Sequence, residues 1–306
     1  MFKRDSQGFL PEMIEKIYKD RVIYKKRELK AQKEYQKNPT NDLKKEIARC
    51  HNVQWARKIA LNSCYGAIGN QYFRYYDIAQ ASAVTTAGQY IIRNIEQKVN
   101  EYLNQILQTH NEVDYILASD TDSIYVSFDK LVEKTCKDKT DQQVCDFLAK
   151  VCDNKLEPFI AKQFEDIADY TNAFKNAMVM AREVIANKGI WVAKKRYMLN
   201  VLDEEDVRLS EPKLKIMGIE AIKSSNPQVC RGKIKEAIKI IMSKEQSDLH
   251  TFIADFKKEF MSMSAEQISF PRSCNNMRKY GSSKDVFIKG TPIHVKGSLI
   301  YNHQIK

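Results

Sequence analysis

Two aspartates lie close together in the stretch ILASDTDSIYVS, residues 116–127. Asp120 and Asp122 stand between two short runs whose β-branched and aromatic residues are typical of β-strands. The Ser-Asp-Thr-Asp segment between those runs is typical of a turn. Because side chains two residues apart on an extended chain share a face, we expect both carboxylates to point the same way. Hard cations such as Mg²⁺ prefer such oxygen ligands, although an ordinary solvated turn is the more common meaning of a D-x-D pair.

A second candidate group combines cations, an amide and an aromatic ring. Lys58, Asn62 and Tyr65 in KIALNSCYG are spaced i, i+4 and i+7, so they share one face of a helix. Arg21 and Lys25 are also four residues apart. In an antiparallel pair of helices, a rise of about 1.5 Å per residue places Arg21 and Lys58 at similar heights. Three cations gathered in this way suit a triphosphate, although a helix with a merely solvated polar stripe is the alternative.

The hydrophobic pattern predicts the elements that must position these groups. Helices are expected at residues 10–36, 42–65, 86–107 and 141–170. The first two, separated by a break at Asn38-Pro39, should form an antiparallel hairpin. Strand-like runs occur at residues 177–180 and 197–202, and from residue 219 the pattern is mainly helical, with a glycine-punctuated tail at residues 281–297. This order indicates an α+β fold with helices behind an antiparallel sheet.

Composition narrows the class of protein. The chain has 306 residues, is 43% hydrophobic and carries a formal net charge of +11, which favours a polyanionic partner. Its seven cysteines form no C-x-x-C pair, which indicates reduced, mostly buried thiols rather than a zinc ribbon. Neither a signal peptide nor a membrane-spanning segment is recognisable, so we expect a cytoplasmic protein with no membrane partner.

Four motifs, in this order along the chain, resemble those of family B DNA polymerases. KIALNSCYG is similar to the K-x-x-x-N-S-x-Y-G motif of that family, and Asp120-Thr121-Asp122-Ser123 resembles its palm signature. KKRY at residues 194–197 and EPKLKIMG at residues 211–218 make the sequence most similar to replicative polymerases of T-even-type bacteriophages. The resemblance extends over essentially the whole chain. It implies DNA-templated transfer of nucleotides from dNTP to a primer 3′-hydroxyl, by a mechanism that uses two Mg²⁺ ions, in the cytoplasm of the host cell.

The resemblance also implies roles for individual residues. The phosphates of the incoming nucleotide would be bound by Arg21, Lys25 and Lys58, with support from Asn62, while Tyr65 and Gly66 would pack by the nascent base pair. Asp122 would be a direct ligand of the metal ions, and Asp120 would be an accessory carboxylate. The residues expected to contact primer–template DNA are Lys194, Lys195, Arg196, Tyr197, Lys213, Lys215 and Lys223.

The implied architecture has three subdomains. Residues 1–70 would form the fingers as an antiparallel helical hairpin, residues 71–218 the palm, and residues 219–306 the start of an incomplete helical thumb. The D-x-x-S-L-Y-P pattern that supplies the family's other metal-binding aspartate does not occur in the sequence. We therefore expect a partner chain, an N-terminal polymerase half with an exonuclease and the missing aspartate, and a sliding clamp reached through further sequence. The alternative is a non-enzymatic, nucleic-acid-binding remnant of a polymerase.

Overall fold

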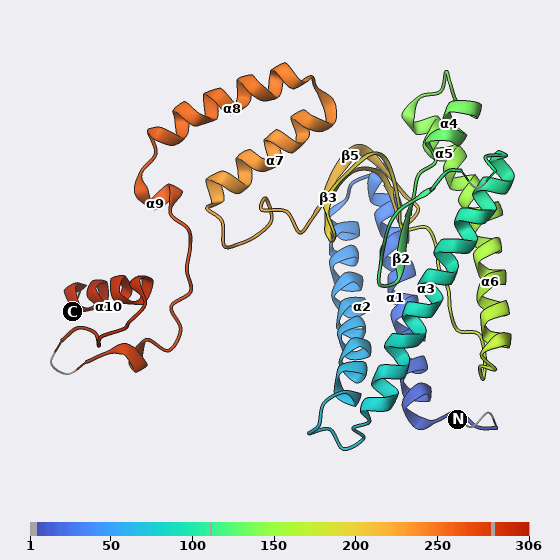
Figure 1. Cartoon of the computed structure of the whole chain (residues 1–306), viewed down its shortest axis with the longest axis horizontal. Helices are drawn as coiled ribbons and strands as arrows, with labels where there is room; N and C mark the ends of the chain where they lie inside the picture. The colour runs from blue at the N-terminus through green and yellow to red at the C-terminus, as the bar shows by residue number, and fades with distance from the viewer. Residues whose placement is uncertain (1–4, 111, 283–284, 306) are drawn as a thin grey trace. The chain divides into compact units, whose positions relative to one another are not determined.

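The computed structural model describes residues 5–110, 112–282 and 285–305 and combines helices with small antiparallel sheets, as expected for an α+β protein (Figure 1). In chain order the elements are α1 (Phe9–Lys37), α2 (Asn41–Ile68), α3 (Ile78–Leu107), β1 (Ile116–Asp120), β2 (Ser123–Val126), α4 (Asp129–Thr135), α5 (Asp141–Val151), the π-helical turn η1 (Cys152–Leu156), α6 (Glu157–Tyr170), β3 (Val184–Ala193), β4 (Arg196–Glu204), β5 (Val207–Met217), α7 (Gln228–Ser243), α8 (Gln246–Met261), α9 (Ala265–Ile268), the 3₁₀ turn η2 (Met277–Tyr280) and α10 (Ile293–Ile305). Among these helices, none has the length and apolar character needed to cross a membrane.

The chain divides into two compact units. The first contains residues 1–189 and 199–213, and the second contains residues 190–198 and 214–306. The division passes through the sheet that β3, β4 and β5 form, so each unit contains part of every strand of that sheet. Assignment of fingers, palm and thumb to residue ranges stays a prediction.

The α1–α2 pair forms the expected antiparallel hairpin (Figure 1). Thr40 begins α2 because its side chain accepts a hydrogen bond from the backbone N–H of Leu43. The helix continues through Gly66 and ends at Ile68, with Gly69 as its C-cap, so the expected end at residue 65 was too early. An ion pair between Arg57 and Asp20, with Nε and Oδ2 2.7 Å apart, bridges the two helices.

Helix α3 contributes buried residues to one side of the hydrophobic core of the first unit. It begins at Ile78, eight residues before the expected start, because the side chain of Asp77 caps the backbone N–H groups of the first turn. Its buried apolar face packs against α6 and against the start of β1. The buried residues of this core are Ile95, Val99, Leu103, Leu107, Tyr115, Ile116, Cys152, Leu156, Ile160, Phe164 and Ile167. This packing fixes the start of β1, which is the root of the β1–β2 hairpin, at the end opposite the turn.

Strands β3, β4 and β5 pair in sequence order. Two-residue connections at Lys194–Lys195 and Glu205–Asp206 make the neighbouring strands antiparallel hairpins. The structure confirms a strand at the expected run 197–202, but residues 177–180 form neither helix nor strand, and Val179 there is 80% exposed. The sequence pattern did not predict β5, whose Pro212 is tolerated because β5 is an edge strand.

The second unit has a separate core in which α7 packs on the ends of the sheet strands that belong to this unit. Its buried residues are Met198, Ile219, Ala221, Ile238 and Met242. Helix α10 runs through Gly297, so the glycine-punctuated tail is partly helical. All seven cysteines are free, and four of them are buried, as the sequence indicated.

Candidate functional site

The aspartate pair lies at the tip of the β1–β2 hairpin. Asp120 pairs with Ser123 in the strand register, which leaves Thr121 and Asp122 as a two-residue turn. Thr121 has a φ of 59°, so the chain is not extended between the two aspartates, and the sequence argument from an extended chain was wrong at this residue. The turn instead brings the backbone N–H of Asp122 2.6 Å from the carbonyl oxygen of Asp120.

The two carboxylates offer oxygen ligands of the kind that Mg²⁺ prefers. The hydroxyl of Thr121 donates to Oδ1 of Asp120 at 3.0 Å, which orients that carboxylate. In the part of the chain that the structure describes, no group of three or more His, Cys, Asp or Glu side chains is arranged to hold a metal ion. Mg²⁺ commonly binds one or two protein carboxylates and takes its remaining ligands from water and substrate phosphates. The donor set therefore fits a site that is shared with further ligands.

The cations expected to bind phosphates stand on the α1–α2 hairpin. The ion pair between Asp20 and Arg57 joins the chain neighbours of Arg21 and Lys58, so these two segments lie at the same level of the hairpin. Nε of Arg21 is buried and has no hydrogen-bond partner among the described residues. Convergence of these cations on a single ligand stays a prediction.

Lys25 and Lys58 have different electrostatic partners. Nζ of Lys25 lies 2.6 Å from Oε1 of Glu205, in the turn between β4 and β5. Nζ of Lys58 lies 5.3 Å from the centre of the Trp55 ring, in cation–π geometry. A carboxylate neutralises the charge of a lysine, whereas an aromatic ring leaves that charge in place. The two lysines therefore differ in their availability to an anion.

The last turns of α2 carry the other expected nucleotide-binding residues. Asn62, Tyr65 and Gly66 are all exposed, and 42% of Tyr65 is accessible to solvent. A Cβ atom built on Gly66 would meet nothing within 4 Å, so packing within the described chain does not require glycine here. This surface of α2 is consequently open to a ligand.

Most of the residues expected to contact DNA lie in the second unit. Lys194 and Lys195 are exposed in the β3–β4 turn, while the buried Tyr197 stacks on Trp191. The structure brings Arg196 and Lys223 together on the carboxylate of Glu220, although these two cations are far apart in sequence. The pKa of Glu220 lies below its ordinary value because its own backbone N–H and then Lys223 donate hydrogen bonds to it.

The glycine that ends EPKLKIMG is required by a close backbone approach. Gly218 has a φ of 66°, and a Cβ atom there would lie 2.2 Å from the carbonyl oxygen of Lys195. Any other residue would displace the KKRY turn from the end of β5. Lys215 is half-buried in the second unit, whereas Lys213 belongs to the first unit and pairs with Glu204 at 2.6 Å.

Comparison with known proteins assigns the family. The model of DNA polymerase family B matches residues 1–284. The chain belongs to the family B DNA polymerases. This family B chain is 37% identical over 274 residues to the DNA-directed DNA polymerase of Enterobacteria phage T4, a match that covers 86% of the chain and 30% of that relative. It is 41% identical over 265 residues to the DNA-directed DNA polymerase of Escherichia phage RB69, covering 83% of the chain and 29% of that relative.

A cellular relative extends the comparison. DNA polymerase 1 of Aeropyrum pernix is 23% identical over 313 residues, and the match covers 97% of this chain and 26% of the relative. The family B chain thus spans less than a third of the length of each of these curated relatives. The phage relatives confirm the expected likeness to T-even-type polymerases.

Sequence reasoning about this family B chain missed the partners of its cations. Glu205 and Glu220 are distant in sequence from Lys25 and Arg196, so no local pattern links them. Trp55 is different, because it stands three residues before Lys58 on the same helix, and the i, i+3 spacing of an aromatic and a lysine could have revealed their contact.

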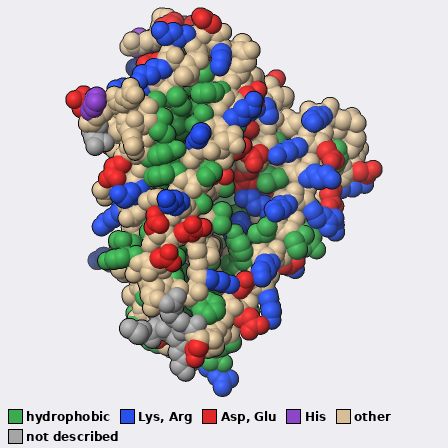
Figure 2. All heavy atoms as spheres, turned by 90° about the vertical axis from the view of Figure 1, so that its right-hand side faces the viewer, with side chains coloured by type: hydrophobic (Ala, Val, Ile, Leu, Met, Phe, Trp, Pro, Cys, Tyr) green, Lys and Arg blue, Asp and Glu red, His purple; other side chains and the backbone are tan. Residues whose placement is uncertain are grey.

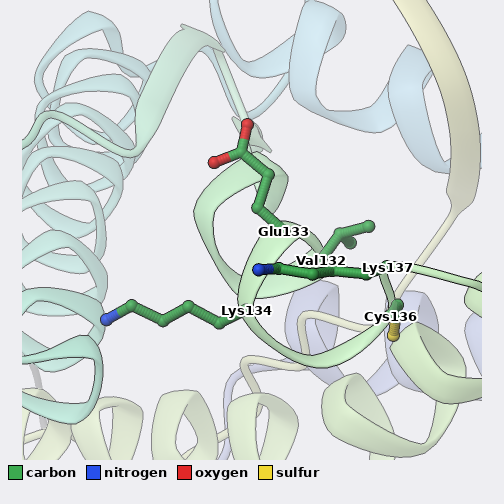
Figure 3. A pocket seen from close by; sticks show the side chains of 5 residues that line it. All are labelled: Val132, Glu133, Lys134, Cys136 and Lys137. Atoms are coloured by element: carbon green, nitrogen blue, oxygen red, sulfur yellow. The ribbon is translucent and has the colours of Figure 1, made fainter.

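The described surface of the family B chain also has a hollow that lies apart from the predicted site residues. Figure 2 shows Lys and Arg side chains spread over the viewed face and interspersed with Asp and Glu. A hollow beside α4 is lined by Val132, Glu133, Lys134, Cys136 and Lys137 (Figure 3). Nζ of Lys134 donates to the carbonyl oxygen of Leu107 at 2.8 Å, which ties this lysine to the end of α3. None of the residues predicted for nucleotide, metal or DNA binding lines this hollow.

Proposed function

We propose that this chain supplies the nucleotide-binding fingers and the palm of a DNA polymerase that adds nucleotides from dNTP to a primer 3′-hydroxyl. In this proposal residues 1–70 are the fingers, residues 71–218 the palm and residues 219–306 the start of the thumb. The observation that carries the proposal is the order of four family B motifs within the 284 residues that match the family model. The D-x-x-S-L-Y-P pattern is absent from these 306 residues, so its aspartate would come from another segment or chain.

Asp122 and Asp120 would hold the metal ions at the tip of the β1–β2 hairpin. Bound Mg²⁺ would activate the primer 3′-hydroxyl and neutralise charge on the leaving pyrophosphate. The hairpin serves this role because its two-residue turn fixes the backbone of Asp122, while the buried root of β1 anchors the strand against α3. Rigid placement of the carboxylates limits the reorganisation that the reaction requires.

The α1–α2 hairpin would bind the triphosphate. Arg21, Lys25 and Lys58 would hold its oxygens with charge-assisted hydrogen bonds, and Asn62 would support them. The exposed ring of Tyr65 and the open space above Gly66 would accept the nascent base pair. Lys25 would have to leave Glu205 before it could contact a phosphate.

Primer–template DNA would be bound through its phosphates. The phosphate contacts would be made by the cations Lys194, Lys195, Arg196, Lys213, Lys215 and Lys223, because Tyr197, the remaining residue expected to contact DNA, is buried against Trp191. Lysines and arginines on a strand turn and at strand ends suit backbone contacts that position the duplex without reading its sequence. Glu220 would keep Arg196 and Lys223 close together until DNA arrives.

Complementation tests this function. The purified chain should extend a primer negligibly by itself and should gain activity when mixed with an N-terminal polymerase half that carries D-x-x-S-L-Y-P and an exonuclease. A matched half in which the aspartate of that pattern is replaced by asparagine should not restore extension. Robust extension by the chain alone would contradict the need for a second aspartate. Binding of DNA without extension by the mixture would instead identify a non-enzymatic, DNA-binding remnant.

A further inference from the structure

We infer that Trp55 is a positioning residue for the ammonium group of Lys58, an inference that rests on the proposed role of Lys58 in binding the triphosphate. The centre of the Trp55 ring lies 5.3 Å from Nζ of Lys58, and Trp is the side chain that attracts a cation most strongly through its ring face. Both residues stand on α2, three positions apart, so the contact is a local feature of one helix face.

The ring of Trp55 is itself held in place. The His51 ring stacks on it, with the ring centres 6.0 Å apart and the planes inclined by 17°. Nδ1 of His51 lies 2.9 Å from Oε1 of Glu28 on α1, a carboxylate that can only accept, so His51 donates. The side chain of Glu28 is 8% exposed, so the residue that accepts from His51 is itself buried. Glu28, His51, Trp55 and Lys58 thus form a continuous series of contacts that ends at the ammonium group.

The cation–π contact of Lys58 with Trp55 differs chemically from an ion pair with an acidic residue. The structure shows no carboxylate in ion-pair contact with Lys58 among the described residues, whereas Lys25 is paired with Glu205. A ring attracts the ammonium group to one side but does not neutralise it, so the opposite side stays able to bind an anion. A lysine side chain loses considerable rotamer entropy when it is fixed, and fixing it in advance lowers the cost of binding.

The exposure of Trp55 supports a role other than core packing. The residue is 49% exposed, so its ring contributes little to the interior, and its removal should leave the α1–α2 hairpin folded. Ile59, the neighbour of Lys58 in sequence, is 53% exposed and makes a matched control for loss of an exposed apolar side chain from the same helix.

Equilibrium binding of Mg·dTTP to the full chain, measured by calorimetry, tests the inference. Because a cation–π contact at an exposed site is worth about 0.5–1 kcal/mol, W55A should raise the Kd about two- to five-fold. W55F should give an intermediate Kd, and I59A should match the parent. Thermal midpoints should agree among the variants. In a double-mutant cycle, W55A should have no further effect once Lys58 is replaced by alanine, a result that a purely structural role for Trp55 would not give.

The outcomes distinguish failure of the role inferred for Trp55 from failure of the proposed nucleotide site at Lys58. If K58A weakens binding but W55A binds as the parent does, Trp55 does not position Lys58 and the nucleotide site stands. Trp55 is likewise excluded as a positioning residue if W55A weakens binding equally with and without Lys58. If the parent chain does not bind Mg·dTTP, or K58A binds as tightly as the parent, the proposed nucleotide site itself fails.

Discussion

Lys25 and Glu205 form an ion pair that joins α1 to the turn between β4 and β5, with Nζ and Oε1 2.6 Å apart. The two residues are 180 positions apart in sequence. Both residues of the turn, Glu205 and Asp206, have positive φ values, 51° and 63°, which match a tight hairpin turn of type I′. The turn therefore presents Glu205 rigidly to a lysine that the family resemblance assigns to the nucleotide.

Removal of the carboxylate at Glu205 should strengthen triphosphate binding. E205Q frees Lys25, and a partly exposed ion pair is worth about 0.2–1 kcal/mol, so the Kd for Mg·dTTP should fall by up to about five-fold. E204Q is the matched control, because Glu204 pairs with Lys213 and not with Lys25. Calorimetric titration of both variants checks this, and an unchanged Kd in E205Q would show that the ion pair does not compete with the nucleotide.

Asp122 should be essential for nucleotide addition, and Asp120 less so. D122N keeps the turn, since asparagine also suits turns, but removes the charge that would hold Mg²⁺. Single-turnover incorporation by the complemented polymerase should fall by several orders of magnitude, while D120N should lose less. Magnesium is titrated over a wide range in each case, and circular dichroism controls for folding. Incorporation by D122N at the parent rate would make the hairpin tip an ordinary solvated turn.

Lys223 should contribute one phosphate contact to DNA binding. Each neutralised phosphate contributes about 0.9 to the slope of log K against log salt, so K223A should make that slope shallower by about this amount. K258A is the control, because Lys258 is an 82% exposed lysine side chain of the same unit with no predicted DNA role. Fluorescence anisotropy of a primer–template at several salt concentrations measures both slopes. Equal slopes for K223A and the parent would remove Lys223 from the DNA site.

Arg182 should be far more important for stability than an exposed arginine. Arg182 pairs with Asp203, and the two side chains are 7% and 3% exposed. R182M would leave a buried carboxylate with only a 3.7 Å contact to Arg208, at a cost of about 3–5 kcal/mol. R57M, which breaks the half-exposed pair with Asp20, should cost about 1 kcal/mol or less. Urea unfolding compares the variants, and similar losses in both would contradict the prediction.

Cys152 should be nearly unreactive at neutral pH. Burial raises the pKa of its thiol to about 11, so little thiolate forms near pH 8, and iodoacetamide should label it much more slowly than the half-buried Cys230. The unfolded chain loses this proton near pH 9, so the free energy of unfolding should fall as the pH rises from about 9 to 11. C152A should lack this part of the pH dependence, as measured by unfolding at several pH values.

Local signals in the sequence determined much of the first unit. Hydrophobic periodicity and the break at Asn38-Pro39 were enough to locate α1 and α2 to within a few residues, because each signal acts over one or two helical turns. The composition around Asp120 and Asp122 likewise predicted a hairpin with both carboxylates near its tip. The order of the four motifs was enough to indicate the family.

Other features were decided by contacts between distant residues. The alternation in β5 is interrupted by Pro212, and only its place at the edge of the sheet explains why a strand forms there. No local pattern shows that Glu205 meets Lys25, that Asp203 is buried against Arg182, or that Gly218 faces the Lys195 carbonyl oxygen. The sequence by itself determined which residues carry charge and where the α1–α2 hairpin forms. Tertiary structure alone decided which charges distant in sequence neutralise one another, such as Lys25 and Glu205, because these ion pairs depend on distances that only the folded backbone sets.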